Sequence, residues 1–118
     1  VTRQVLYDGA YDIPCQFRYF ECLPGGYSTL EYHEHTHMVM IGRGKGQLLL
    51  GDEIYDVKKG DFIEIPGNTI HQFRANKGDY IGFFCLVNKE RDKVKLLSDE
   101  EMETLRNHPK IKAFLESC

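Results

Sequence analysis

Turn residues recur at short intervals along most of this chain, and they constrain its fold more than any other feature. Between residues 16 and 87, short apolar or alternating runs are separated by glycine, proline, asparagine and aspartate. Gly51-Asp52 divides two such runs by two residues, which is a strong signal for a β-hairpin. The glycine-rich segment 42–46 is also expected to be a hairpin turn between strands. Short strands at this spacing predict an all-β sandwich or barrel.

The pattern changes after Lys89, where the spacing of apolar residues becomes helical. Ser98 followed by Glu101 matches a capping box, and Pro109 is expected to divide the tail into two short helices. We therefore expect three regions. They are an N-terminal extension or strand at 1–15, a barrel at 16–88 and C-terminal helices packing on the barrel at 89–118.

Length and charge narrow the functional classes. A chain of 118 residues suits a single domain. Its 15 basic and 18 acidic residues give a net charge of −3, without the lysine and arginine cluster that nucleic-acid binding requires. No apolar run approaches the roughly 20 residues that cross a bilayer. We expect a protein that contacts neither nucleic acid nor membrane.

The cysteines are few and far apart, and none forms a Cys-x-x-Cys pair. A disulfide-stapled secreted domain would be denser in cysteine. We therefore expect a reduced, cytoplasmic protein, although the spacing leaves a Cys15–Cys22 disulfide open.

Histidines alternate at positions 33, 35 and 37, and His71 follows the turn Pro66-Gly67-Asn68. The surroundings predict strands, in which every second side chain shares a face and the α-carbons of His33 and His35 lie about 6.6 Å apart. Two imidazoles at that separation can bind one metal ion, with a third ligand from elsewhere, and His71 is the obvious candidate. His37 has the same parity and is an additional candidate, whereas Glu34 is expected to face away.

Two motifs surround these histidines. The first reads glycine, a spacer, His-x-His and a later glycine, and the second reads glycine, five residues, proline and a final histidine. Their defining residues here are Gly26, His33, His35, Gly46, Gly60, Pro66, Gly67 and His71. With this spacing, residues 17–87 resemble the cupin superfamily of small jelly-roll barrels, or double-stranded β-helices, with an internal metal site. The resemblance implies a divalent metal ion, either iron, manganese, nickel or zinc.

The chain departs from the cupin pattern at three places. The spacer before His33 is one residue longer, and Asn68, which tolerates left-handed backbone geometry, replaces a glycine. Val39 stands where the motif has a glutamate ligand, and valine cannot bind a metal. The resemblance therefore implies a three-histidine site of His33, His35 and His71. Without the glutamate, the ion keeps its full +2 charge and should attract an anionic small molecule.

Three functions fit these residues. The first is an enzyme with a mononuclear metal centre, because three protein ligands leave positions open for substrate. Three-histidine cupin sites are similar to those of thiol dioxygenases and diketone-cleaving dioxygenases, which suggests an oxidoreductase. The second is a non-catalytic cupin that binds a small molecule or stores metal, and the third is a barrel that its metal only stabilises.

Other residues have simpler interpretations. Glu64 could join the site, but it is expected to be an exposed or interface carboxylate, and His108 a surface residue. Cys85 is expected to pack in a barrel strand near the metal. An apolar wall around the site is expected from Tyr19, Met40, Phe62, Phe73 and Phe83.

The chain is also expected to form a homodimer. The apolar stretch Val5-Leu6-Tyr7 could pair with a neighbouring copy, because an exposed edge strand needs covering.

Overall fold

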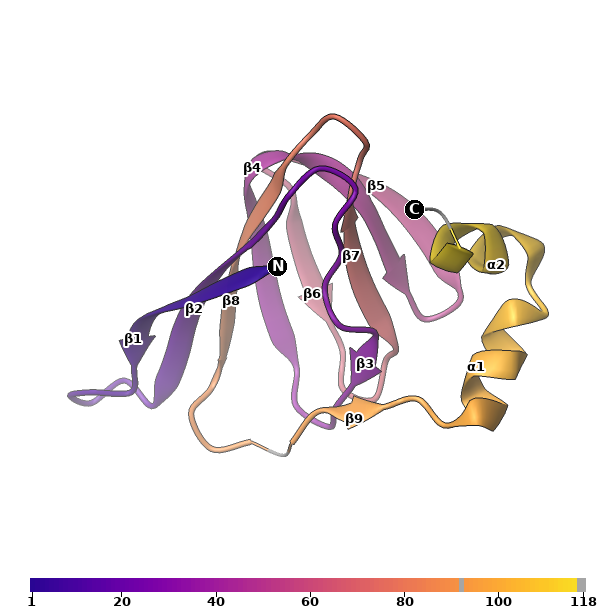
Figure 1. Ribbon diagram of the computed structural model, residues 1–118. Coiled ribbons are helices and arrows are strands. Elements are labelled where there is room, and N and C mark those ends of the chain that lie inside the picture. The colour runs from indigo at the N-terminus through magenta and orange to yellow at the C-terminus, as the bar shows by residue number, and fades with distance from the viewer. Residues whose placement is uncertain (92, 117–118) are drawn as a thin grey trace.

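The computed structural model describes residues 1–91 and 93–116, which fold into a curled antiparallel barrel with two short helices on one side (Figure 1). The predicted all-β jelly-roll class and its helical tail are confirmed. The strands and helices are β1 (Thr2–Asp8), β2 (Cys15–Cys22), β3 (Glu31–Tyr32), β4 (His37–Leu50), β5 (Glu53–Lys58), β6 (Phe62–Ile65), β7 (His71–Ala75), β8 (Ile81–Asn88), β9 (Lys95–Leu96), α1 (Asp99–Arg106) and α2 (Pro109–Glu116).

Two sheets form the barrel, and both contain β4. The first sheet has the order β1-β2-β8-β4-β6, and the second has the order β5-β4-β7-β3-β9. The first half of β4 pairs with β6 and β8, while its second half pairs with β5 and β7. One long strand therefore joins the two sheets by passing from one into the other.

The expectation of a hairpin at residues 42–46 is wrong, because β4 continues through these glycines. The register against β8 shifts between Ile41 and Arg43, and Gly44 has a φ of 72°. Glycine adopts this left-handed geometry without a steric penalty, so the segment bends as a bulge within the strand. By contrast, the hairpin at Gly51-Asp52 is confirmed, with Leu50 opposite Glu53.

Alternation along the strands decides which side chains face the interior. In β4, Val39 and Ile41 are buried, whereas Met40 is 49% exposed. Phe73 and Phe83 stack at 4.3 Å between ring centroids inside the barrel, as expected of the apolar wall. The other three expected members of the wall are outside it, because their parity is opposite. Met40 and Phe62 are exposed, and Tyr19 packs against the Phe84 ring.

Two apolar clusters hold the fold together. One fills the barrel, and the second lies between the helices and the second sheet, where Leu49 meets Leu105, Ile111 and Phe114. Ser98 and Glu101 make both hydrogen bonds of the predicted capping box, and α2 begins at Pro109 as expected. Among the described residues, neither helix has the length and apolar character needed to cross a membrane.

Two further expectations concern single residues. Cys15 and Cys22 are free thiols, so the disulfide left open between them does not form. Asn68 has a φ of 58°, the left-handed geometry expected where the motif has glycine. Cys118 lies outside the described residues.

Candidate metal centre

The segment that carries His33 and His35 is not a strand, contrary to the sequence prediction. Strand β3 ends at Tyr32 and β4 begins at His37, so residues 33–36 form a bend between them. The bend crosses the Pro66-Gly67-Asn68 turn, where the Asn68 backbone N–H donates to the His33 carbonyl at 2.6 Å. This tertiary contact, rather than strand periodicity, positions the two imidazoles.

Four histidines nevertheless meet at one end of the barrel interior. His33, His37 and His71 are buried, and His35 is half-buried. The His33 ring stacks on the rings of His35 and His37, each at 4.0 Å between centroids, and lies 4.8 Å from the ring of His71. The additional candidate, His37, thus belongs to the cluster.

Two overlapping groups of side chains have the spacing of metal ligands. Ligand atoms of His33, His35 and His37 lie within 4.8 Å of one another, and so do those of Glu31, His33 and His71. His33 is common to both groups. The three histidines implied by the cupin resemblance are therefore divided between them.

Backbone carbonyls set the tautomers of two of these imidazoles. His33 Nδ1 lies 2.8 Å from the His35 carbonyl oxygen, and His71 Nδ1 lies 2.9 Å from that of Thr69. A carbonyl oxygen only accepts, so both Nδ1 atoms carry the proton and both Nε2 atoms keep a lone pair. Metal-bound histidines characteristically have this arrangement. The donor set fits a divalent metal ion.

A second chain of contacts links the cluster to a thiol. His35 Nε2 and His37 Nε2 lie 2.9 Å apart, and His37 Nδ1 lies 3.2 Å from Cys85 Sγ. Arg18 Nη2 donates to the same sulfur at 3.2 Å. Cys85 is buried, as expected of a packing residue, but its polar contacts were not predicted.

Burial controls the ionisation of the site. Burial, followed by the His33 imidazole, lowers the pKa of His37 to about 2. Burial also lowers the pKa of His71 to about 4, against the opposing effect of its hydrogen bond to Thr69. Burial raises the pKa of the Cys85 thiol and of the Glu31 carboxyl. The imidazoles of His37 and His71 are therefore neutral at pH 7, as metal binding requires.

Glu31 is the site residue that sequence reasoning missed. It precedes His33 by two residues, and its carboxylate lies 3.9 Å from His71 Nε2. Val39 lines the cavity, so the carboxylate of this site comes from β3 rather than from the usual motif position on β4. The spacing of two residues between Glu31 and His33 was the sequence signal that could have identified Glu31 as a site residue. Glu64 is exposed on the outer face, opposite Met38.

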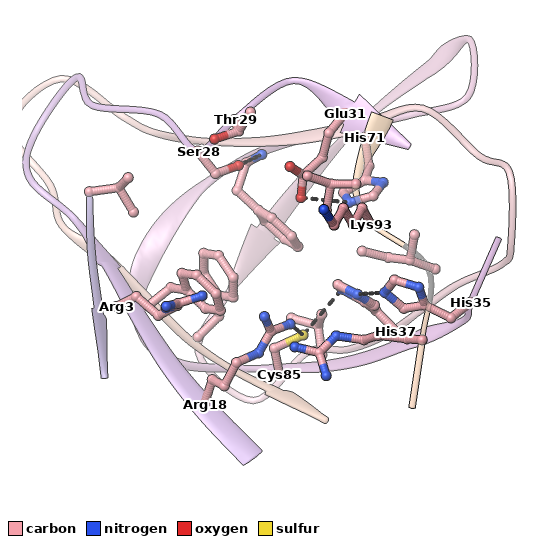
Figure 2. Close-up of a pocket in the computed structure, with 18 of the residues that line it drawn as sticks. Arg3, Arg18, Ser28, Thr29, Glu31, His35, His37, His71, Cys85 and Lys93 are labelled. Carbon is pink, nitrogen blue, oxygen red and sulfur yellow. Dashed lines mark hydrogen bonds and ion pairs between the residues drawn. The ribbon is translucent and has the colours of Figure 1, made fainter. Parts of the chain in front are cut away.

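The cluster opens into a cavity of about 720 Å³. Figure 2 shows His35, His37 and His71 at one end, with Arg3 and Arg18 toward the other. Apolar side chains, including Phe20, Phe73 and Phe83, also line the cavity. A small polar molecule could therefore reach the imidazoles.

The fold agrees with the comparison with known proteins. The cupin domain family matches residues 18–87, and the chain belongs to this family.

A curated relative from Rhodospirillum rubrum is named 1-methylthio-D-xylulose 5-phosphate methylsulfurylase. It is 45% identical over 116 residues, which cover 98% of this chain and 74% of the relative. A crystal structure of a cupin 2 conserved barrel domain protein from Rhodopseudomonas palustris has a TM-score of 0.91 at 49% identity, covering 95% of this chain and 77% of that one. A cupin-2 domain from Rhodospirillum rubrum has a TM-score of 0.92 at 43% identity, covering 98% and 77%.

Proposed function

We propose that this chain is a metal-dependent enzyme that acts on a phosphorylated ketose bearing a methylthio group. The observation that carries the proposal is the meeting of a histidine cluster and the Cys85 thiol at one cavity. The name of the Rhodospirillum rubrum relative supports this substrate class. It favours chemistry at sulfur over the oxygenase reaction that the three-histidine resemblance first suggested.

His33, His35 and His71 would hold the metal, with His37 as a fourth ligand. The expected ion is divalent iron, manganese, nickel or zinc. A bound divalent ion would act as a Lewis acid that polarises the ketone oxygen of the substrate.

Cys85 is the residue we assign to the sulfur chemistry, because it is the thiol among the described residues that line the cavity. Attack of its sulfur on the methylthio sulfur forms an S–S bond and breaks the bond from sulfur to carbon 1. The electron pair stays on carbon 1, where the adjacent ketone delocalises it, and the proton lost by the thiol ends on that carbon. A small thiol from solution then releases the methylthio group as a mixed disulfide and restores Cys85.

The test combines metal analysis with a turnover assay. The purified chain, loaded in turn with iron, manganese, nickel or zinc, is given 1-methylthio-D-xylulose 5-phosphate and a small thiol, and the 1-deoxyketose product is followed by NMR. We expect His71→Ala to lose both stoichiometric metal and turnover, and Cys85→Ser to keep the metal but lose about 100-fold or more in rate. His108→Ala, an exposed position in the helical tail, is the matched control.

Each outcome has a defined meaning. Stoichiometric metal without turnover would leave the chain as a non-catalytic metal-binding or ligand-binding cupin. Metal that changes only the melting temperature would indicate a structural role. Full activity in Cys85→Ser would remove the cysteine from the mechanism.

A further inference from the structure

The cavity has a charge opposite to that of the chain as a whole. The chain carries a net charge of −3, yet the described lining residues include five basic side chains and one carboxylate, that of Glu31. The basic lining residues are Arg3, Arg18, Lys89, Arg91 and Lys93. Such a concentration of positive charge in a concave site attracts anions.

Arg18 is the unusual member of this set. It lies on β2 directly opposite Cys85 on β8, and it is 7% exposed. One of its nitrogens, Nη2, donates to Cys85 Sγ, and its guanidinium lies 5.1 Å from the centroid of the Phe20 ring. Its Nε atom is buried and has no hydrogen-bond acceptor within the described part of the chain. Burying a cation with an unused donor is costly unless an anion completes the site.

Arg74 is a buried arginine with a structural role, and the barrel supplies partners for its guanidinium group. It is 8% exposed, similar to Arg18. Its Nε donates to Gln72 and its Nη2 donates to the Leu115 carbonyl, while its guanidinium lies over the rings of Tyr27 and Phe114. Arg74 thereby fastens α2 to the barrel. Within the described residues, Arg18 makes no comparable set of contacts.

Two further arginines line the same cavity. Arg91 is held by hydrogen bonds from Nη2 to the Gln16 side chain and from Nη1 to the carbonyls of Asn88 and Lys89. Burial and the nearby Arg18 charge lower the pKa of Arg91, so the two cations lie close enough to repel. Arg3 lines the cavity from the edge strand β1 (Figure 2). An anion between these groups would relieve their repulsion.

We propose that Arg18, together with Arg91 and Arg3, forms a subsite for the phosphate group of the substrate. The proposal rests on the proposed function. It names the residues that bind the phosphate end of the substrate, which is the end that the metal does not hold. Guanidinium groups bind phosphate through paired, charge-assisted hydrogen bonds. Cys85 lies between this subsite and the histidines, with its sulfur 3.2 Å from both Arg18 Nη2 and His37 Nδ1.

Binding measurements on the full chain stripped of metal test the subsite without requiring turnover. Binding of inorganic phosphate, D-xylulose 5-phosphate and D-xylulose would each be measured by isothermal titration calorimetry. We expect Arg18→Gln to weaken binding of both phosphate compounds by about tenfold or more, and Arg91→Gln to weaken it by several-fold. Arg43→Gln is the matched control, because Arg43 is 55% exposed and pairs with Glu21 instead of lining the cavity. It should bind like the wild type.

Several results would overturn the subsite. These are wild-type protein that fails to bind inorganic phosphate, wild-type protein that binds D-xylulose as tightly as its phosphate, or folded variants with unchanged affinity. Melting curves identify variants that do not fold, and if Arg18→Gln is one of them, Arg91→Gln and Arg3→Gln decide the matter.

The two proposals can fail separately. If the metal-loaded protein does not turn over the methylthio sugar phosphate but phosphate binding still depends on Arg18, the reaction is wrong and the subsite stands. If turnover occurs and Arg18→Gln alters neither phosphate affinity nor KM, the reaction stands and the subsite is wrong.

Discussion

At the scale of single residues, two backbone carbonyls and a set of buried neighbours prepare the histidines for a metal. The carbonyls of His35 and Thr69 hold the Nδ1 protons of His33 and His71. Burial keeps the rings of His37 and His71 neutral by lowering their pKa values. The arrangement favours metal binding but opposes protonation.

Because the folded protein disfavours protonation of these rings, we predict that the metal-free protein loses stability in mild acid. The pKa of His71 is lowered from 6.5 to about 4, so below pH 6.5 the unfolded chain binds a proton that the folded chain does not. Stability should therefore fall between pH 6.5 and pH 4, by up to about 3 kcal/mol for this residue. Urea unfolding at pH 7, 6 and 5 measures the loss.

A variant isolates the contribution of His71 from those of other groups. His71→Gln removes one of two titrating rings and should make the dependence on pH less steep, with the part due to His37 remaining. His108→Gln, at an exposed position, should leave the dependence unchanged. Identical slopes in His71→Gln and the wild type would contradict the assignment.

At the scale of elements, the bend in β4 is what joins the two sheets. Before the bend β4 carries His37 and pairs with β6 and β8, and after it Leu50 pairs with His71 on β7. An added Cβ at Gly44 would collide with the Tyr80 carbonyl oxygen. A side chain at this position would block the close approach of β4 to the backbone of Tyr80.

We therefore predict that Gly44→Ala destabilises the barrel by about 3 kcal/mol or more, since it combines left-handed strain with a clash against backbone. Gly78→Ala is the matched control. Gly78 has a φ of 84°, but a Cβ added there would meet nothing within 4 Å, so this variant should lose only about 1 kcal/mol. Chemical denaturation of both variants gives the comparison, and equal losses would show that the close approach is unimportant.

At the scale of the whole molecule, the outer face of the first sheet is unusually apolar. Met38, Met40, Phe62 and Leu86 are each 37–60% exposed. The strand register places Met38 beside Leu86 and Met40 beside Phe62, so the four form a contiguous patch. Exposed apolar patches of this kind mark interaction surfaces.

The homodimer expected from the sequence stays a prediction, and the structure suggests which surface to test. We expect two copies to cover this patch about a twofold axis. Phe62→Lys should then shift the sedimentation coefficient from dimer to monomer. Leu6→Lys, on the exposed edge strand β1 that the sequence first suggested, should not. A monomeric wild type would remove the idea, and a monomer produced only by Leu6→Lys would return the interface to β1.

Local sequence information determined much of this protein. Turn spacing predicted the barrel, Ser98 and Pro109 predicted the helices, and the two cupin motifs pointed to His33, His35 and His71. These features depend on the conformational preferences of a few consecutive residues, which a sequence displays directly. The hairpin predicted at the glycines of residues 42–46 was wrong because a turn and a strand bulge have similar local sequences.

Only the tertiary structure assembled the rest of the site. Glu31 from β3, Arg18 from β2 and Cys85 from β8 meet the histidines because strand register places Arg18 opposite Cys85 and Glu31 opposite His71. Alternation tells which face of a strand a side chain occupies, but it does not tell which distant strand lies beside it. Which strands become neighbours depends on how the whole barrel folds. That arrangement brings the thiol and the buried arginine beside the histidine cluster.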